Sequence, residues 1–125
     1  MSDSPRFLNV DVDVRCAAGG LPLLNHLRNR SVLLCEEDGG FSFEAIEQHD
    51  DVEGCVAALV ALVQGLPTSL LTAWNACEDR IFDVGFEAPS GKHSVMVELL
   101  PSTVRAISDV GAKLRVTIYQ TRSQP

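Results

Sequence analysis

The chain has 125 residues and a formal net charge of −7, with 46% hydrophobic and 22% charged residues. This length is typical of a single domain, and the composition is that of a globular protein rather than a disordered one. Lys and Arg are scattered without a basic stripe, so binding to nucleic acid through phosphate contacts is not expected. We expect one domain over residues 1–125, with residues 1–5 and 120–125 as flexible tails.

The apolar runs and the cysteines indicate a cytoplasmic protein. The polar N-terminus has no signal-sequence pattern, and the most apolar run, residues 55–63, is too short to cross a bilayer, so no membrane partner is expected. Cys16, Cys35, Cys55 and Cys77 lie far apart without a Cys-x-x-Cys pair. We therefore expect four free thiols, and neither a metal site nor a cofactor.

Residues 7–15 predict the central strand of a sheet that is covered on one side only. Successive side chains of a strand point to opposite faces. The segment alternates apolar and polar residues accordingly: Leu8, Val10, Val12 and Val14 against Asn9, Asp11, Asp13 and Arg15. We expect the valine face to lie in the core and the aspartates to be exposed.

The first half of the chain continues with a short helix at residues 21–28 and two strands at 31–36 and 41–47. Residues 37–40 predict a hairpin turn, because Asp-Gly and Gly-Gly tolerate positive φ. The next helix, residues 52–64, is apolar nearly all round, which is typical of a buried helix. Asp50 and Glu53 have the spacing of a capping box at its start. A second helix, residues 68–77, carries Trp74, which we interpret as a core residue.

The second half predicts three more strands, at residues 80–87, 94–99 and 113–119, with a helix at 101–110 before the last of them. Gly111 is placed where a helix would end in a left-handed residue. The fold class is therefore α+β: a mostly antiparallel sheet of about six strands with three to four helices on one face. The order is ferredoxin-like, β-α-β-β-α-α-β-β-α-β.

Several segments of the second half resemble a widespread family of small bacterial domains of unknown function. They are residues 79–86, Leu99-Leu100-Pro101, and residues 107–119, which end in Ile118-Tyr119. The resemblance covers about the last two-thirds of the chain. It implies a bacterial source and supports the fold, but its motifs are structural, so no catalytic or binding residue is carried over.

The outward face of the predicted sheet is the candidate contact surface. Its residues are Asp11, Asp13, Arg15, Asp83, Glu87, Met96, Glu98, Arg115, Thr117 and Tyr119. Gathered carboxylates can act as acid and base or bind a cation, but a solvated face with charges paired across strands accounts for the same pattern. We expect no catalytic residue, and we interpret His26, His49 and His93 as surface residues.

The composition favours a non-enzymatic module that binds another protein, such as an immunity-type inhibitor of a basic partner. In its simplest form the contact face makes a homodimer, with Asp11 and Asp13 pairing with Arg115 across a twofold axis. The alternative is a small-metabolite binder or enzyme, with a pocket between helices and sheet near Trp74.

Overall fold

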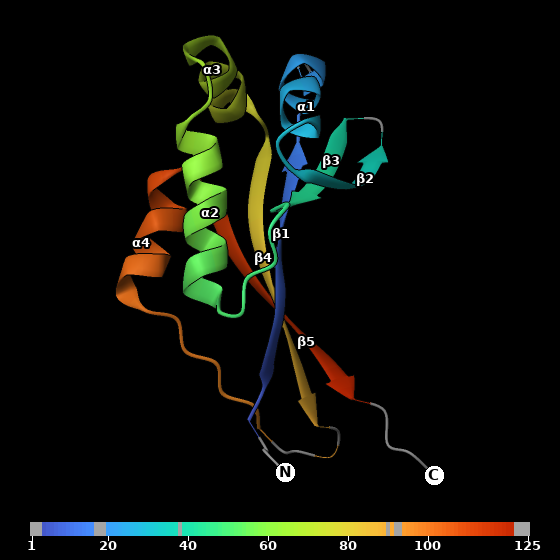
Figure 1. The fold of residues 1–125 in the computed structure, drawn as a ribbon, viewed down its shortest axis with the longest axis vertical. Coiled ribbons are helices and arrows are strands. Elements are labelled where there is room, and N and C mark those ends of the chain that lie inside the picture. The colour runs from blue at the N-terminus through green and yellow to red at the C-terminus, as the bar shows by residue number, and fades with distance from the viewer. Residues whose placement is uncertain (1–3, 17–19, 38, 90, 92–93, 122–125) are drawn as a thin grey trace.

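The computed structural model describes residues 4–16, 20–37, 39–89, 91 and 94–121. These residues form an α+β fold with one five-stranded mixed sheet and four helices (Figure 1). The strands are β1 (Arg6–Arg15), β2 (Val32–Glu37), β3 (Gly40–Glu44), β4 (Asp79–Pro89) and β5 (Lys113–Thr121). The helices are α1 (Gly20–Arg28), α2 (Val52–Gln64), α3 (Thr68–Ala76) and α4 (Pro101–Asp109).

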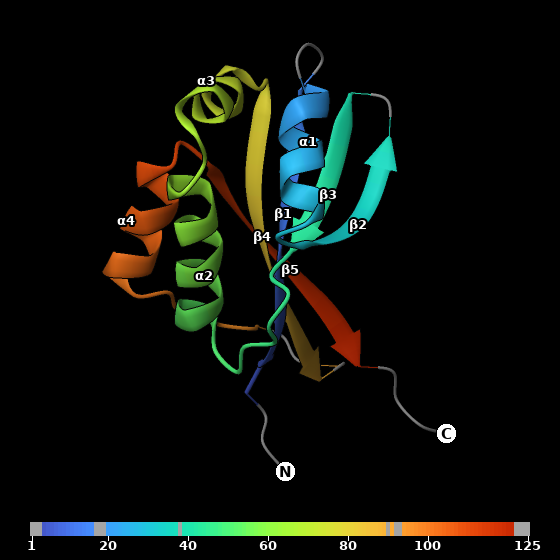
Figure 2. The ribbon, with the colours of Figure 1, turned by 45° about the horizontal axis from the view of Figure 1, so that its top comes forward.

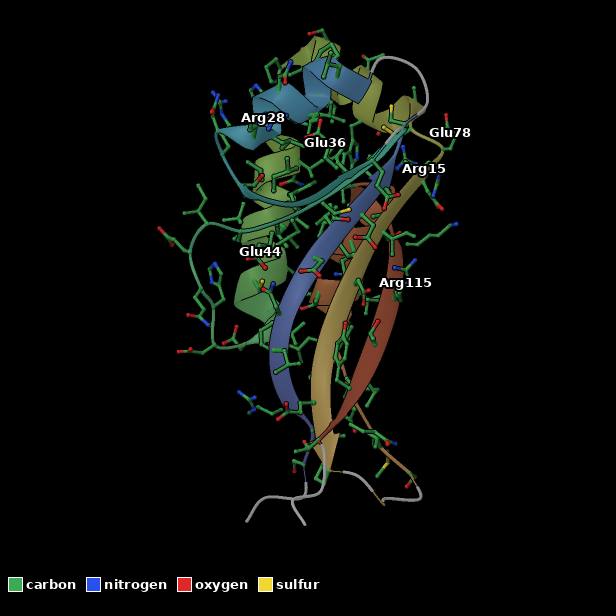
Figure 3. All side chains as sticks on the ribbon, turned by 90° about the vertical axis from the view of Figure 1, so that its right-hand side faces the viewer. Arg15, Arg28, Glu36, Glu44, Glu78 and Arg115 are labelled. Carbon is green, nitrogen blue, oxygen red and sulfur yellow. The ribbon has the colours of Figure 1, made fainter. Side chains whose placement is uncertain are left out.

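The strand order is β2-β3-β1-β4-β5, which places β1 at the centre. β1 is antiparallel to both neighbours, with Val12 opposite Phe43 of β3 and Phe82 of β4. β4 and β5 are parallel, because α4 crosses over between them. The helices lie on one side of the sheet, so the other side is open (Figures 2 and 3).

The predicted facing of β1 is confirmed for its three valines but not for Leu8, which lines a hollow on the open face, while Phe7 packs against the core because the register shifts between Phe7 and Asn9. Asp11 and Asp13 are on the open face as predicted, but they are half-buried rather than exposed. Val10 and Val12 are fully buried, and Val14 is nearly so, against the helical layer. The same face of the sheet adds the apolar residues of β3 and β4: Phe41, Phe43, Phe82, Val84 and Phe86. This face is the core because every strand that contributes to it alternates apolar and polar residues in phase with β1.

The central helix α2 has the bounds that the sequence predicts. Leu59 and Val63 are fully buried, in agreement with a helix that lacks a polar face. Its cap is Asp51, not the predicted Asp50: the Asp51 carboxylate accepts a hydrogen bond from the Gly54 amide at 2.7 Å. Gly111 follows α4 with a φ of 72°, as predicted for a residue in the left-handed region.

The prediction of about six mostly antiparallel strands is matched only in part, and so is the ferredoxin-like order. Residues 94–99 form no strand but part of an extended connection between β4 and α4. Val97 and Leu99 pack against the core, which explains the apolar alternation, but the segment pairs with no strand of the described sheet. The predicted C-terminal tail also begins too early, since Gln120 lies within β5; residues 1–3 and 122–125 lie outside the described residues.

Candidate functional site

The open face of the sheet is built by the polar positions of four strands (Figure 3). On β1 these are the residues that alternate with the buried valines, and β4 places Asp83 directly opposite Asp11. β3 adds Ser42 and Glu44, and β5 adds Arg115 and Thr117. Like charges directly opposite each other destabilise a sheet, so the Asp11–Asp83 pair requires either a nearby cation or protonation.

Arg115 supplies a cation to one side of this face. Its Nη1 donates to Asp13 Oδ2 at 2.9 Å and to Asp83 Oδ2 at 3.4 Å. The second oxygen of each carboxylate also accepts a hydrogen bond, from Ser42 Oγ at 2.8 Å for Asp13 and from Thr117 Oγ1 at 2.7 Å for Asp83. Both oxygens of Asp13 and of Asp83 are therefore hydrogen-bonded within the chain.

Asp11 and Glu44 lie on the other side of the same face and have no such cation. The amide of Asn9 donates to Asp11 Oδ1 at 3.1 Å and also to Glu44 Oε2. Within the part of the chain that the structure describes, neither carboxylate forms an ion pair. Burial, followed by the charges of Glu44, Asp13 and Asp83, raises the pKa of Asp11 from 3.8 to about 6. An ionised Asp11 is thus held at a free-energy cost at neutral pH.

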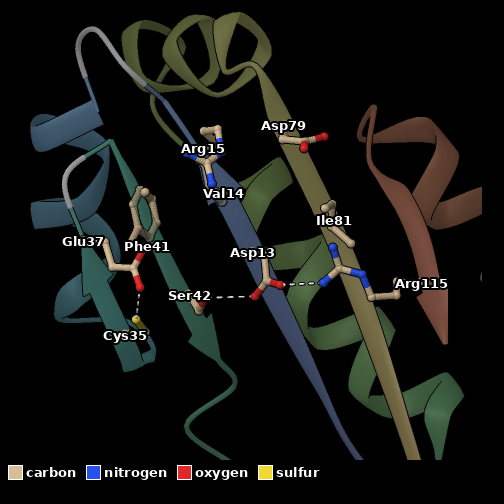
Figure 4. Close-up of a pocket in the computed structure, with 11 residues that line it drawn as sticks. Asp13, Val14, Arg15, Cys35, Glu37, Phe41, Ser42, Asp79, Ile81 and Arg115 are labelled. Atoms are coloured by element: carbon tan, nitrogen blue, oxygen red, sulfur yellow. Dashed lines mark hydrogen bonds and ion pairs between the residues drawn. The ribbon is translucent and has the colours of Figure 1, made fainter. Parts of the chain in front are cut away.

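Two shallow hollows flank these carboxylates. The first, of about 230 Å³, lies toward the β2–β3 turn, with the Asp13–Arg115 pair at its edge (Figure 4). The second, of about 320 Å³, contains Asp11 and Glu44. Its lining combines carboxylates with apolar side chains: Leu8, Asn9, Asp11, Leu34, Glu44, Asp83, Gly85 and Tyr119. The Tyr119 ring lies over Gly85, where an added Cβ would be 3.5 Å from Cε2.

The predicted contact residues divide into two groups. Eight of them lie on the strands that form the open face: Asp11, Asp13, Arg15, Asp83, Glu87, Arg115, Thr117 and Tyr119. Met96 and Glu98 do not, because they belong to the connection between β4 and α4. Asn9, Ser42 and Glu44 were not predicted as site residues, although Ser42 and Glu44 alternate with the buried Phe41 and Phe43 and were detectable from that pattern.

Ion pairs at the ends of the open face match the predicted pairing across strands. Arg6 contacts Glu87 at 3.2 Å, and Lys113 contacts Asp79 at 2.7 Å. Such exposed pairs contribute little to stability. The hydrogen bond of Lys113 is the main reason that the pKa of Asp79 is lowered. These charges are matched within the chain, unlike Asp11 and Glu44.

The remaining candidates from the sequence are the histidines, the cysteines and Trp74. Among the described residues, no group of three or more His, Cys, Asp and Glu side chains is placed to hold a metal ion. His26 lies on α1 and His49 in the loop before α2, while His93 lies outside the described residues. Trp74 is fully buried, and its Nε1 donates to the Val110 carbonyl at 2.9 Å, as fits a core residue.

The comparisons with known proteins give no family. No family model, curated protein or solved structure matches the chain. The resemblance of the second half to a bacterial domain family therefore stays an expectation. No described helix is long and apolar enough to cross a membrane alone, although α2 and α3 pass that test of length and composition as a pair bent by 114°.

Proposed function

We propose that the protein is an interaction module that binds a basic segment of another protein on the open face of its sheet. The observation that carries the proposal is the contrast between two pairs of carboxylates. Asp13 and Asp83 share Arg115, whereas the described partner that Asp11 and Glu44 share is the amide of Asn9. A Lys or Arg from a partner would provide the missing cation and relieve the cost of ionising Asp11.

The chemistry of the second hollow fits a lysine or arginine side chain. Its apolar lining, Leu8, Leu34 and the Tyr119 ring, suits the aliphatic stem of such a residue. The carboxylates of Asp11 and Glu44 suit its charged head, and Tyr119 adds a ring that attracts cations. A net charge of −7 would also speed the encounter with a basic partner at low salt. An immunity-type inhibitor of a basic toxin is one protein class with these requirements.

The test compares three immobilised baits in lysate of the source organism. They are the wild type, the double variant Asp11→Asn with Glu44→Gln, and the control Glu47→Gln with Glu53→Gln. Both variants lose two negative charges, but Glu47 lies in the loop before α2 and Glu53 in the first turn of α2, and neither lines the hollow. We expect basic proteins to be enriched by the wild type and the control and to be lost from the Asp11/Glu44 variant. Equal capture by all three baits would contradict the proposal.

The alternative function, binding of a small metabolite near Trp74, rests on a different hollow. A depression of about 220 Å³ lies beside Trp74, lined by Val63, Gln64, Leu71, Asn75, Asp109 and Val110. These residues come from α2, α3 and the end of α4 rather than from the sheet. A ligand there would change the fluorescence of Trp74, which is the one tryptophan in the chain.

A further inference from the structure

Among the residues that the structure describes, no strand pairs with the outer edge of β5. β5 is the last strand of the described sheet and pairs with β4 in an unbroken parallel register from Lys113 to Thr121. Alternate residues of such a strand direct their backbone N–H and C=O groups away from the sheet. An edge of this length is a template for pairing with a further strand.

The side chains of β5 that belong to the core face are only half covered. Leu114, Val116 and Ile118 are 39%, 41% and 38% exposed, although the residues opposite them on β4 are buried. On α4, which leads into β5, Val104 is 44% exposed. The C-terminal half of β5 runs away from the helical layer, toward the lower right of Figure 1. The edge strand therefore presents both free backbone groups and apolar surface.

The opposite edge of the sheet is protected, and β5 is not. β2 has six residues, its register with β3 shifts between Leu33 and Cys35, and it ends in Glu36 and Glu37. An irregular register and charged side chains are devices that keep edge strands from pairing with other chains. Residues 116–121 of β5 contain no charge, glycine or proline. The difference between the edges points to pairing at β5.

We propose that β5 pairs in antiparallel fashion with β5 of a second copy, with the twofold axis at Val116. In this register Val116 faces Val116 of the other copy, and Leu114 faces Ile118. On the open side Arg115 faces Thr117, and Lys113 faces Tyr119. The aliphatic residues of the core side therefore meet one another, and no like charges lie opposite each other. An antiparallel pair of identical strands has the required twofold symmetry.

Neighbouring registers are poorer by the same criteria. An axis at Arg115 would bring two arginines face to face, and an axis at Thr117 would place Leu114 opposite Gln120. The dimer also differs from one that uses Arg115 as an ion-pair partner across the axis, because Arg115 already contacts Asp13 and Asp83 in its own chain. It goes beyond the proposed partner site, since it uses the outer edge of β5. The two surfaces adjoin at Tyr119, which lines the Asp11–Glu44 hollow and faces Lys113 of the second copy. The two sheets become one continuous sheet.

Sedimentation equilibrium at about 50 μM, a range in which weak dimers are populated, tests the proposal. We expect the wild type to have twice the mass of one chain. Val116→Glu and Val116→Lys each place like charges on the axis and should give the mass of one chain. An equimolar mixture of these two variants should regain the doubled mass, because opposite charges then meet. The control Val32→Glu changes a valine of similar exposure on the β2 edge, 39% against 41% for Val116, and should remain dimeric.

Three results would overturn the proposal: a monomeric wild type, a dimeric Val116→Glu, or a mixture that stays monomeric. Cooperative unfolding of each variant, followed through Trp74 fluorescence, verifies that loss of mass is not loss of fold. If the Val116 variants do not fold, hydrogen exchange of the wild type alone still tests the dimer. Hydrogen exchange of the wild type should show amides of residues 113–121 that lose protection on dilution, and exchange independent of concentration would count against the dimer.

Discussion

Replacing Asp11 with Asn should stabilise the protein at neutral pH. The pKa of Asp11 is about 6 in the folded protein, against 3.8 for an ordinary aspartate, mainly because of burial and then because of Glu44. Between these values the folded state binds more protons than the unfolded chain, so Asp11 makes stability fall as pH rises. This free-energy cost of ionising Asp11 in the folded protein is absent well below pH 3.8, the pKa of an ordinary aspartate, and is complete above about pH 6. Asn has no ionisable group, so the Asp11→Asn variant does not have this cost.

The size of the effect follows from the shift in pKa. A shift of about two units corresponds to about 3 kcal/mol in the limit of an unscreened group. Asp11 is partly exposed, so solvent screening reduces the expected gain for Asp11→Asn to about 1–1.5 kcal/mol at about pH 7.5. At about pH 4.5 Asp11 is largely protonated in the folded protein, so the gain in stability from Asp11→Asn should fall to about a third of that value.

Urea unfolding at these two pH values measures the gain, with Trp74 as the fluorescent probe because its ring is fully buried. The control Glu47→Gln removes an exposed loop carboxylate and should change the free energy of unfolding by less than about 0.5 kcal/mol at either pH. A destabilised Asp11→Asn at neutral pH would refute the reasoning, as would an equal gain at both pH values. Under the proposed function, the same variant binds its partner more weakly while being more stable.

Three further predictions concern the core and the thiols. Val12→Ala removes two methyl groups at a fully buried position in the middle of the sheet and should cost about 2 kcal/mol of unfolding free energy; an unchanged urea midpoint would count against this placement. Leu59→Asp places an unpaired charge at the fully buried centre of α2, costs several kcal/mol, and should yield no folded protein by circular dichroism. Thiol titration should find one fast group in the native protein, Cys35, which is the one exposed cysteine, and four groups after denaturation. Burial, followed by a hydrogen bond with Cys16, raises the pKa of Cys77 to about 12, so its thiol stays protonated, and fast reaction of two or more native thiols would contradict this assignment.

Local patterns were sufficient to predict the layers of the fold. The alternation in β1 identified the buried valines, and the nearly all-round apolar character of residues 52–64 identified the buried helix α2. The same kind of pattern failed at residues 94–99, because alternation shows which side chains seek the core but not whether a neighbouring strand is present. The spacing of apolar residues also does not show whether two neighbouring strands are parallel or antiparallel, so the parallel β4–β5 pair was not predicted.

The candidate site was predicted only as a face. Alternation placed Asp11 and Asp13 on its polar side, where the structure has them. Which residues become neighbours across strands depends on strand order and register, which the sequence pattern does not contain. The partners Glu44 and Ser42 come from β3 for this reason, and so the difference between the satisfied Asp13 and the unmatched Asp11 was not visible before the strands were placed.

The central position of β1 also bears on how the chain folds as it is synthesised. β1 is made first, but one of its two edges is closed by β4, and Arg6 meets a residue 81 positions later in the chain. Contacts between residues so far apart in sequence form slowly. Until residues 79–89 leave the ribosome, the nascent chain carries a long strand with an open edge and a valine-rich face, which are features that favour aggregation. Pairing of β1 with β4 is therefore expected to be the slow step of folding, and chaperones would act before it.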